Sequence, residues 1–307
     1  MQTRWAKRKR SKMGNLIYRP PFEADSLLVE ATCGCSHNCC SFCTMYKDVP
    51  FRVLPESQVE DQLRLAAEIR PEADRVFLEN GDAFVLGADR LSQIAEAIHR
   101  ILPRVSTIAM YASVLNIRTK SDEELRELRS FGINELNIGV ESGLDEALRR
   151  MNKGYTAKEA EYELHRLRNA GIDYSANLIL GLAGAGLWRE NAEATAELMN
   201  KTNPSLIFTG TVHTEPGCRL YDEIESGAFV ENTIGGYLDE EECLLHHLTL
   251  DYSFFFGLHP SNLVRMQGYL QRDKERLLAE LSACRNRHSA ELDKKPVRGQ
   301  EGAILGE

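Results

Sequence analysis

Residues 121–140 read SDEELRELRSFGINELNIGV and predict one helix followed directly by one strand. Ser121 and Glu124 form a capping-box pattern, ahead of an apolar stripe at helical spacing that ends at Phe131. Gly132 then serves as a helix C-cap, because glycine adopts the left-handed conformation without a side-chain penalty. The alternating run that follows is typical of a β-strand.

The same order of signals recurs along the chain. Thr156 and Glu159 repeat the capping box, and Gly171 ends that helix. Pro55 is expected in the first turn of an earlier helix, and Asp89 is expected to cap the next one. Apolar runs predict six strands, at residues 27–32, 75–79, 107–111, 135–140, 174–180 and 206–212. This βα alternation predicts an α/β fold whose parallel sheet is either doubly wound or closed into a barrel.

Length and composition set further limits. The 307 residues are 43% hydrophobic and 27% charged, as in a soluble globular protein with a core large enough to fold without disulfides. The chain contains neither a long apolar span nor a secretory signal, so we expect a cytoplasmic protein with no membrane contact. The net charge of −9 includes a basic start, and the acidic remainder is a poor surface for nucleic acid. We expect a basic segment at 1–26, a core at 27–215, a C-terminal cap at 216–285 and a disordered tail at 286–307.

Cysteines gather directly after the first predicted strand. Five of the eight lie within eleven residues, namely Cys33, Cys35, Cys39, Cys40 and Cys43. This loop belongs at the carboxyl edge of the sheet, where parallel α/β folds place their active sites. Zinc requires four ligands, and no second cysteine pair exists beyond the loop. Three thiolates from one loop suit an iron–sulfur cluster that leaves one iron open.

A cysteine triad on this loop, with Phe42 immediately before Cys43, resembles the signature of the radical SAM superfamily. The resemblance implies a [4Fe–4S] cluster, S-adenosylmethionine (SAM) as the ligand of its fourth iron, and cleavage of SAM to a 5′-deoxyadenosyl radical. The usual spacing leaves three and then two residues between cysteines. Cys35, Cys40 and Cys43 keep the second spacing, and we favour them over the alternative in which Cys39 replaces Cys40.

Three further segments extend the resemblance. Residues 80–82 are similar to the family's Gly-Gly-Glu segment, which takes the methionine amino group, and residues 139–142 resemble the Gly-Val-Glu-Ser segment of the coproporphyrinogen-oxidase-like branch, which binds the ribose. Residues 177–181 look like the strand that packs against the adenine. With this resemblance we predict a partial (β/α)6 TIM-like barrel with a C-terminal helical cap. The predicted cofactor-binding residues are Phe42, Asn80, Gly81, Asp82, Tyr111, Glu141, Ser142, Asn177, Ile179 and Gly181.

The sixth predicted strand supplies candidates for the substrate side. Thr209, Thr211 and His213 alternate onto one face, and Glu215 follows; for His213 and Glu215 a loop-stabilising hydrogen bond is the alternative. The remaining cysteines stand alone, so one cluster is predicted. We expect an enzyme that abstracts hydrogen from a small molecule, with flavodoxin or ferredoxin as reductant. A non-catalytic haem or iron–sulfur carrier and an RNA-modifying enzyme are the alternatives.

Overall fold

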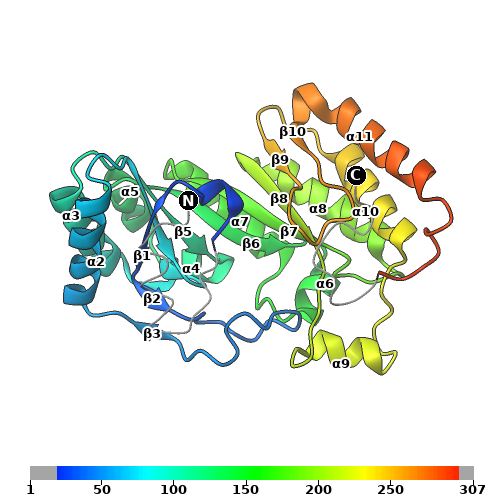
Figure 1. The fold of residues 1–307 in the computed structure, drawn as a ribbon, viewed down its shortest axis with the longest axis horizontal. Helices are drawn as coiled ribbons and strands as arrows, with labels where there is room; N and C mark the ends of the chain where they lie inside the picture. Colours follow the sequence, from blue (N-terminus) through cyan, green and yellow to red (C-terminus); the bar gives the residue numbers. More distant parts are fainter. Residues whose placement is uncertain (1–18, 297–307) are drawn as a thin grey trace.

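The computed structural model describes residues 19–296 and contains one eight-stranded sheet (Figure 1). In sheet order the strands are β1 (Leu27–Glu30), β4 (Arg75–Glu79), β5 (Thr107–Ala112), β6 (Ile133–Glu141), β7 (Asp173–Leu180), β8 (Leu206–Thr211), β9 (Phe254–Phe256) and β10 (Gln267–Tyr269). All neighbours pair in parallel except β9 and β10, which are antiparallel. The six predicted strands are confirmed, and their sequential order in the sheet is that of a partial barrel.

Helices follow the strands as the crossover pattern requires. They are α2 (Glu56–Ile69), α3 (Ala88–Ile101), α4 (Val114–Arg118), α5 (Asp122–Ser130), α6 (Asp145–Arg150), α7 (Ala157–Asn169), α8 (Trp188–Thr202), α9 (Arg219–Glu225), α10 (Ile234–His247) and α11 (Leu270–Arg287). Figure 1 shows α2 and α3 at one end of the molecule and α8, α10 and α11 at the other. Two short 3-10 helices, η1 (Pro21–Glu23) and η2 (Ala83–Val85), and a small ribbon of β2 (Thr32–Cys33) and β3 (Arg52–Val53) complete the fold.

The helix ends test the capping predictions. The capping boxes at Ser121 and Thr156 are both present, with each hydroxyl accepting from the backbone N–H three residues on. Pro55 is the N-cap residue of α2. The cap predicted at Asp89 is wrong, because α3 begins after Gly87 and Asp89 lies inside the first turn, where its charge still favours the positive end of the helix dipole.

The two faces of the sheet differ in polarity. In a parallel sheet, residues in register share a face. One row across five strands is buried and almost entirely apolar, and it consists of Val29, Leu78, Met110, Leu136 and Tyr174. The next row on the opposite face contains Tyr111, Asn137 and Ser175. The first face packs under the helices, and the second lines the inside of the barrel.

The beginning of the described chain packs against the sheet, with Glu23 ion-paired with the first residue of β4. Phe22 packs edge-on against Phe208 and Phe256, with ring centroids 6.2 and 5.7 Å apart. Glu23 is fully buried and pairs with Arg75 at 2.6 Å. We expected the core to begin at residue 27, after a basic segment. The structure instead packs η1, which lies before that boundary, against the barrel. The basic residues 1–18 lie outside the described residues.

The C-terminal region adds elements that the sequence reasoning did not assign. The aromatic stretch that contains β9 extends the sheet, because all three residues of β9 pair in parallel with β8, and Phe255 is completely buried. Residues 286–296 were expected to be disordered, but α11 runs to Arg287, and the carbonyl of Leu292 accepts from the N–H of Gly235 at 2.8 Å. Contact with α10 therefore orders a segment of low hydrophobicity; the rest of the expected tail, 297–307, lies outside the described residues. Within 19–296, no helix is long and apolar enough to cross a membrane.

Candidate active site

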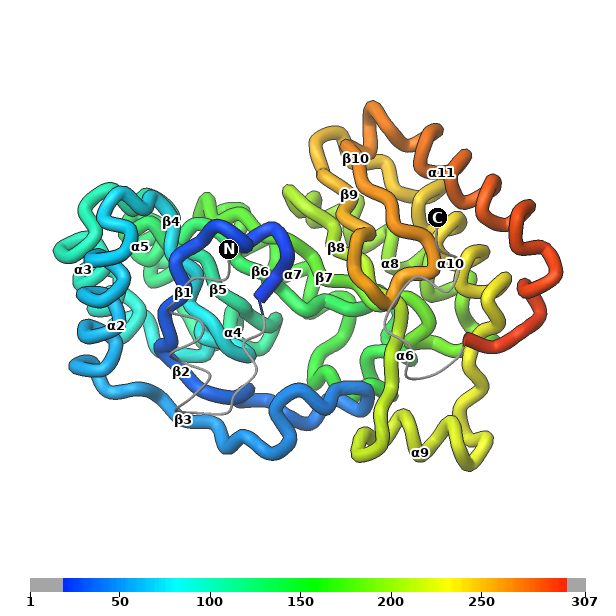
Figure 2. The backbone as a smooth tube through the Cα atoms, in the orientation of Figure 1, coloured from blue at the N-terminus to red at the C-terminus, as the bar shows by residue number. Residues whose placement is uncertain are grey.

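The cysteine loop follows β2 at the carboxyl edge of the sheet. Figure 2 shows this segment in blue as it runs along the lower side of the molecule toward α6 and α9 and returns to β3. Cys35, Cys40 and Cys43 are partly buried, whereas Cys39 is exposed. The remaining cysteine of the loop, Cys33, is buried in the core.

The three partly buried thiols interact electrostatically. Burial, with a smaller contribution from Asp82, raises the pKa of Cys35 to about 11. Burial also raises the pKa values of Cys40 and Cys43. The charge of Cys40 adds to the shift at both Cys35 and Cys43, so Cys40 lies within electrostatic reach of both. The exposed Cys39 has its Sγ 3.4 Å from the ring of His37.

This donor set fits an iron–sulfur cluster better than a single metal ion. Across residues 19–296, no three His, Cys, Asp or Glu side chains are arranged to hold one ion. In a [4Fe–4S] cluster each thiolate binds a different iron, so the sulfur atoms need not converge on one point. Raised pKa values keep the thiols protonated until a metal displaces the protons, which is the usual coupling of metal binding and proton release.

The turn between α6 and α7 holds the cysteine loop in place. The backbone N–H of Ser41 donates to the carbonyl of Met151 at 3.1 Å, and its hydroxyl donates to that of Arg150 at 2.8 Å. Asn152 donates through its amide to the carbonyl of Cys39 at 3.0 Å. Phe42 is partly buried and packs against the hydrophobic cluster that includes Met151. The turn therefore sets the position of the middle of the loop.

The end of β4 supports the first cysteine of the proposed triad. Gly81 donates its N–H to the carbonyl of Gly34 at 3.0 Å, and a Cβ at this position would lie 2.6 Å from the Cβ of Cys35. Only glycine permits this approach. Asp82 accepts from both the N–H and the hydroxyl of Ser36, at 3.1 and 2.5 Å, and burial nevertheless raises the pKa of its carboxyl. Asn80 adopts a left-handed φ of 81° and donates to the carbonyl of Thr32.

A buried ion pair lies at the end of β6. Glu141 has a left-handed φ of 67°, at the point where the register with β7 shifts, and its carboxylate is 3.0 Å from Nζ of Lys153. Both side chains are less than one tenth exposed. Burial by itself would lower the pKa of Lys153, but the charges of Glu141, Tyr155 and Cys40 and the hydrogen bond to Glu141 together outweigh it and hold the pKa well above its ordinary value. The charge of Lys153 also lowers the pKa of Cys40, which opposes the effect of burial.

Sequence reasoning did not single out Lys153. It lies in the turn between α6 and α7, outside the three segments that extend the resemblance. The ion pair depends on a long-range approach between the β6 end and the α6–α7 turn, which residue spacing does not reveal.

Ser142 faces the helices and not the barrel interior. Its hydroxyl is fully buried, donates to Oδ1 of Asn191 at 2.5 Å and accepts from the N–H of Leu144 at 2.9 Å. The side chain predicted for the ribose therefore has partners within the protein, because the chain turns after the register shift at Glu141.

The inner side of β7 carries Asn177 and Ile179, both partly exposed. In the described part of the chain, the buried Oδ1 of Asn177 has no hydrogen-bond partner. Tyr111 lies on the same inner face and packs edge-on against Phe77, with centroids 5.4 Å apart. Burial raises the pKa of Tyr111. These positions form a wall with both polar and aromatic groups.

Gly181 ends β7 with φ of 89°, a conformation that favours glycine. We expected a flat ring of the cofactor to approach it closely. In the structure the ring in contact is that of Tyr237, from α10, which a Cβ at Gly181 would strike. The glycine therefore makes room for a helix of the C-terminal cap.

We predicted that Thr209 and Thr211 face the interior of the barrel, but they lie on the opposite face of β8. Thr209 and Thr211 are in register with Leu178 and Leu180, so they share the apolar face, and both hydrogen bond to Asn262. The inner face of β8 instead carries Phe208 and Gly210, in register with Asn177 and Ile179. The side chains of β8 do alternate between the two faces, as predicted. Which set of alternate residues faces inward depends on the pairing with β7.

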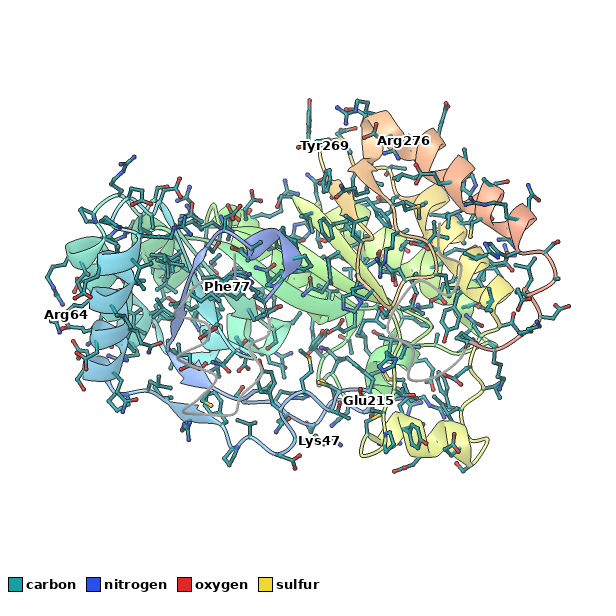
Figure 3. All side chains as sticks on the ribbon, viewed as in Figure 1. Lys47, Arg64, Phe77, Glu215, Tyr269 and Arg276 are labelled. Carbon is teal, nitrogen blue, oxygen red and sulfur yellow. The ribbon has the colours of Figure 1, made fainter. Side chains whose placement is uncertain are left out.

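The loop after β8 meets the cysteine loop. His213 and Glu215 are exposed, with Nε2 and Oε1 3.6 Å apart. Thr44 donates to Glu215 at 3.3 Å, and Lys47 donates to the carbonyl of Gly217 at 2.6 Å. Figure 3 shows Lys47 and Glu215 near each other below the sheet. These contacts match the loop-stabilising alternative for Glu215.

Comparisons with known proteins agree with this geometry. A sequence model of the radical SAM superfamily matches residues 29–198. The chain is 25% identical over 160 residues to the heme chaperone HemW of Bacillus subtilis, covering 52% of this chain and 41% of that protein. It is 29% identical over 218 residues to the tRNA-2-methylthio-N(6)-dimethylallyladenosine synthase of Chlorobium phaeobacteroides, covering 68% of this chain and 45% of the relative. The chain thus spans less than half the length of these two relatives.

Among solved structures, methylornithine synthase (PylB) has a similar fold. Its TM-score is 0.53 at 13% identity, over 97% of this chain and 91% of that chain. This likeness concerns the fold alone. Together with the family match it confirms the predicted α/β barrel class, and the HemW relative agrees with the predicted branch.

Proposed function

The chain belongs to the radical SAM superfamily, and from this we propose that it is a single-cluster enzyme that removes a hydrogen atom from a small-molecule substrate. The superfamily uses a [4Fe–4S] cluster and SAM. When bound, the cluster supplies the electron that cleaves SAM to methionine and a 5′-deoxyadenosyl radical. The observation that carries the proposal is the group of three partly buried, electrostatically coupled thiols at the carboxyl edge of the barrel.

We propose Cys35, Cys40 and Cys43 as the cluster ligands. The partial burial of Cys40, which it shares with Cys35 and Cys43, supports this choice. Cys39 is exposed, and its backbone carbonyl is held by Asn152. A ligand that faces solvent would leave the cluster open to water and oxygen, which burial of the other three avoids.

The chain's own residues have distinct parts in this proposal. Gly81 allows β4 to approach Cys35, and Asp82 holds the loop through Ser36. Lys153 supplies a buried cation whose charge lowers the pKa of Cys40 and thereby favours its thiolate, while its own partner is Glu141. The inner-face residues Asn177 and Phe208 line the space expected for cofactor and substrate.

The reductant is proposed to be flavodoxin or ferredoxin, because radical SAM enzymes need a low-potential electron donor. We propose the cytoplasm as the compartment, since all eight cysteines are free thiols and a reducing environment keeps them so.

Anaerobic reconstitution tests the proposal with a matched pair of variants. The wild-type protein and Cys39→Ala are expected to bind about four irons per chain and to release 5′-deoxyadenosine with dithionite and SAM, whereas Cys40→Ala loses both. If Cys39→Ala loses the cluster and Cys40→Ala keeps it, the ligand assignment is wrong. A wild-type protein that binds iron and SAM without releasing 5′-deoxyadenosine would favour the non-catalytic carrier, and stoichiometric haem binding would strengthen that reading.

A further inference from the structure

One carboxylate from the C-terminal cap is hydrogen bonded, directly or through one side chain, to the ends of β6 and β7. Glu240 on α10 is completely buried. Its Oε2 accepts from the N–H of Gly181 at 3.0 Å and from the side-chain amide of Asn232 at 3.1 Å. Its Oε1 accepts from the side-chain amide of Asn191 at 2.7 Å. A carboxylate is an acceptor only, so all three neighbours must present N–H groups to it.

The carboxylate thereby orients a chain of hydrogen bonds that reaches β6. Because Asn191 directs its NH2 group at Glu240, its carbonyl oxygen faces Ser142 and accepts from that hydroxyl. The Ser142 oxygen is then left to accept from the N–H of Leu144. Glu240 therefore orders the turn after β6 through Asn191 and the turn after β7 directly at Gly181.

Packing reinforces the same junction. Tyr237, one turn earlier on α10, lies against Gly181. Glu240, Asn191, Glu141 and Ile179 line one small cavity of about 10 Å³, which is about the volume that one water molecule needs. The network and the Glu141 end of β6 therefore face the same small cavity.

We propose that Glu240 is a positioning residue for cofactor binding: it holds the ends of β6 and β7, which carry Glu141 and Ile179, in the arrangement that binds the adenosyl part of SAM. This inference rests on the proposed function. Glu240 lies outside residues 29–198, which match the superfamily, so the support comes from a part of the chain beyond the family match.

The chain offers a matched control on the same helix. Glu241 is also buried, and its Oε1 has no hydrogen-bond partner within the described residues. Glu240→Gln and Glu241→Gln each replace a buried carboxyl with an amide of the same shape. Only Glu240→Gln places an NH2 group opposite another N–H donor, so that one hydrogen bond is lost. That donor is either Asn191 or the pair of Gly181 and Asn232.

The experiment measures the dissociation constant of labelled SAM by equilibrium dialysis with the anaerobically reconstituted protein, together with hydrogen exchange of peptides that contain Gly181 and Leu144. Glu240→Gln is expected to weaken SAM binding about tenfold, the effect of about one lost hydrogen bond to a charged group, and to speed exchange in both peptides at unchanged iron content. Glu241→Gln is expected to bind SAM as the wild type does and not to speed exchange in either peptide.

Two results would overturn the inference: a Glu240→Gln protein that binds SAM as the wild type does, or equal weakening in both variants. If Glu240→Gln does not fold, Asn191→Ala breaks the branch toward β6 and is expected to weaken SAM binding severalfold; unchanged binding would again overturn the inference. Absence of SAM binding by the wild-type protein itself would instead overturn the proposed function, and the positioning role with it.

Discussion

The buried carboxyl of Glu241 makes the stability of this protein depend on pH. Burial, with the neighbouring charge of Glu240 as the smaller cause, raises the pKa of Glu241 from its ordinary value of 4.5 to about 8. In the unfolded chain the group loses its proton near pH 4.5, while the folded protein retains it. The unfolded state therefore gains a relative advantage as the pH rises between these values, and this contribution to stability falls with increasing pH.

The magnitude follows from the size of the pKa shift. Each pH unit between the two pKa values costs about 1.4 kcal/mol, so the free energy of unfolding loses at most about 4 kcal/mol between pH 5 and pH 8 through this group. Glu241→Gln keeps the shape of the side chain and removes the titration. We expect its melting temperature to equal that of the wild type within about 2 °C at pH 5 and to exceed it by about 5 °C or more at pH 8.

Differential scanning fluorimetry of both proteins at constant ionic strength measures this gap. The exposed Glu72→Gln serves as a control for loss of one surface charge, and its melting temperature is expected to follow that of the wild type at every pH. The reasoning is refuted if the gap between Glu241→Gln and the wild type does not widen as the pH rises.

Two further substitutions test other parts of the structure. Gly81→Ala places a Cβ 2.6 Å from that of Cys35, so we expect iron content after reconstitution to fall at least by half, whereas Gly186→Ala, whose Cβ meets nothing within 4 Å, keeps the wild-type value; equal iron content in both would show that the approach of β4 is not needed. Arg75→Ala leaves the fully buried Glu23 without its cation, and we expect a loss of about 3 kcal/mol in chemical unfolding that Glu23→Gln in the same chain partly restores. A double variant no more stable than Arg75→Ala would contradict that account.

Local interactions explain what could be predicted from the sequence. The capping boxes at Ser121 and Thr156 and the glycines that end their helices act within a few residues, so the pattern reveals them without any knowledge of the fold. Period-two and helical patterns likewise mark the six strands and the helices between them. The order of these elements predicts a parallel sheet, because parallel strands require crossovers, but it fits a doubly wound sheet as well as a barrel. The barrel was predicted from the family resemblance.

The site contains features that no local pattern carries. Cys39 and Cys40 are adjacent and chemically identical, and only the folded loop turns one outward and draws the other toward Cys35 and Cys43. Lys153 reaches Glu141 only because the α6–α7 turn packs against the carboxyl edge of the sheet.

The sequence by itself therefore determined the α/β class, the succession of strands and helices and the loop that carries the thiols, since these follow from short-range periodicity and capping. Only the tertiary structure decided which face of β8 looks inward and which ring approaches Gly181. The register between β7 and β8 sets the first, and the packing of α10 against β7 sets the second. Both are contacts between residues more than twenty-five positions apart in the chain. Such contacts depend on how the whole core packs, so no single stretch of sequence reveals them.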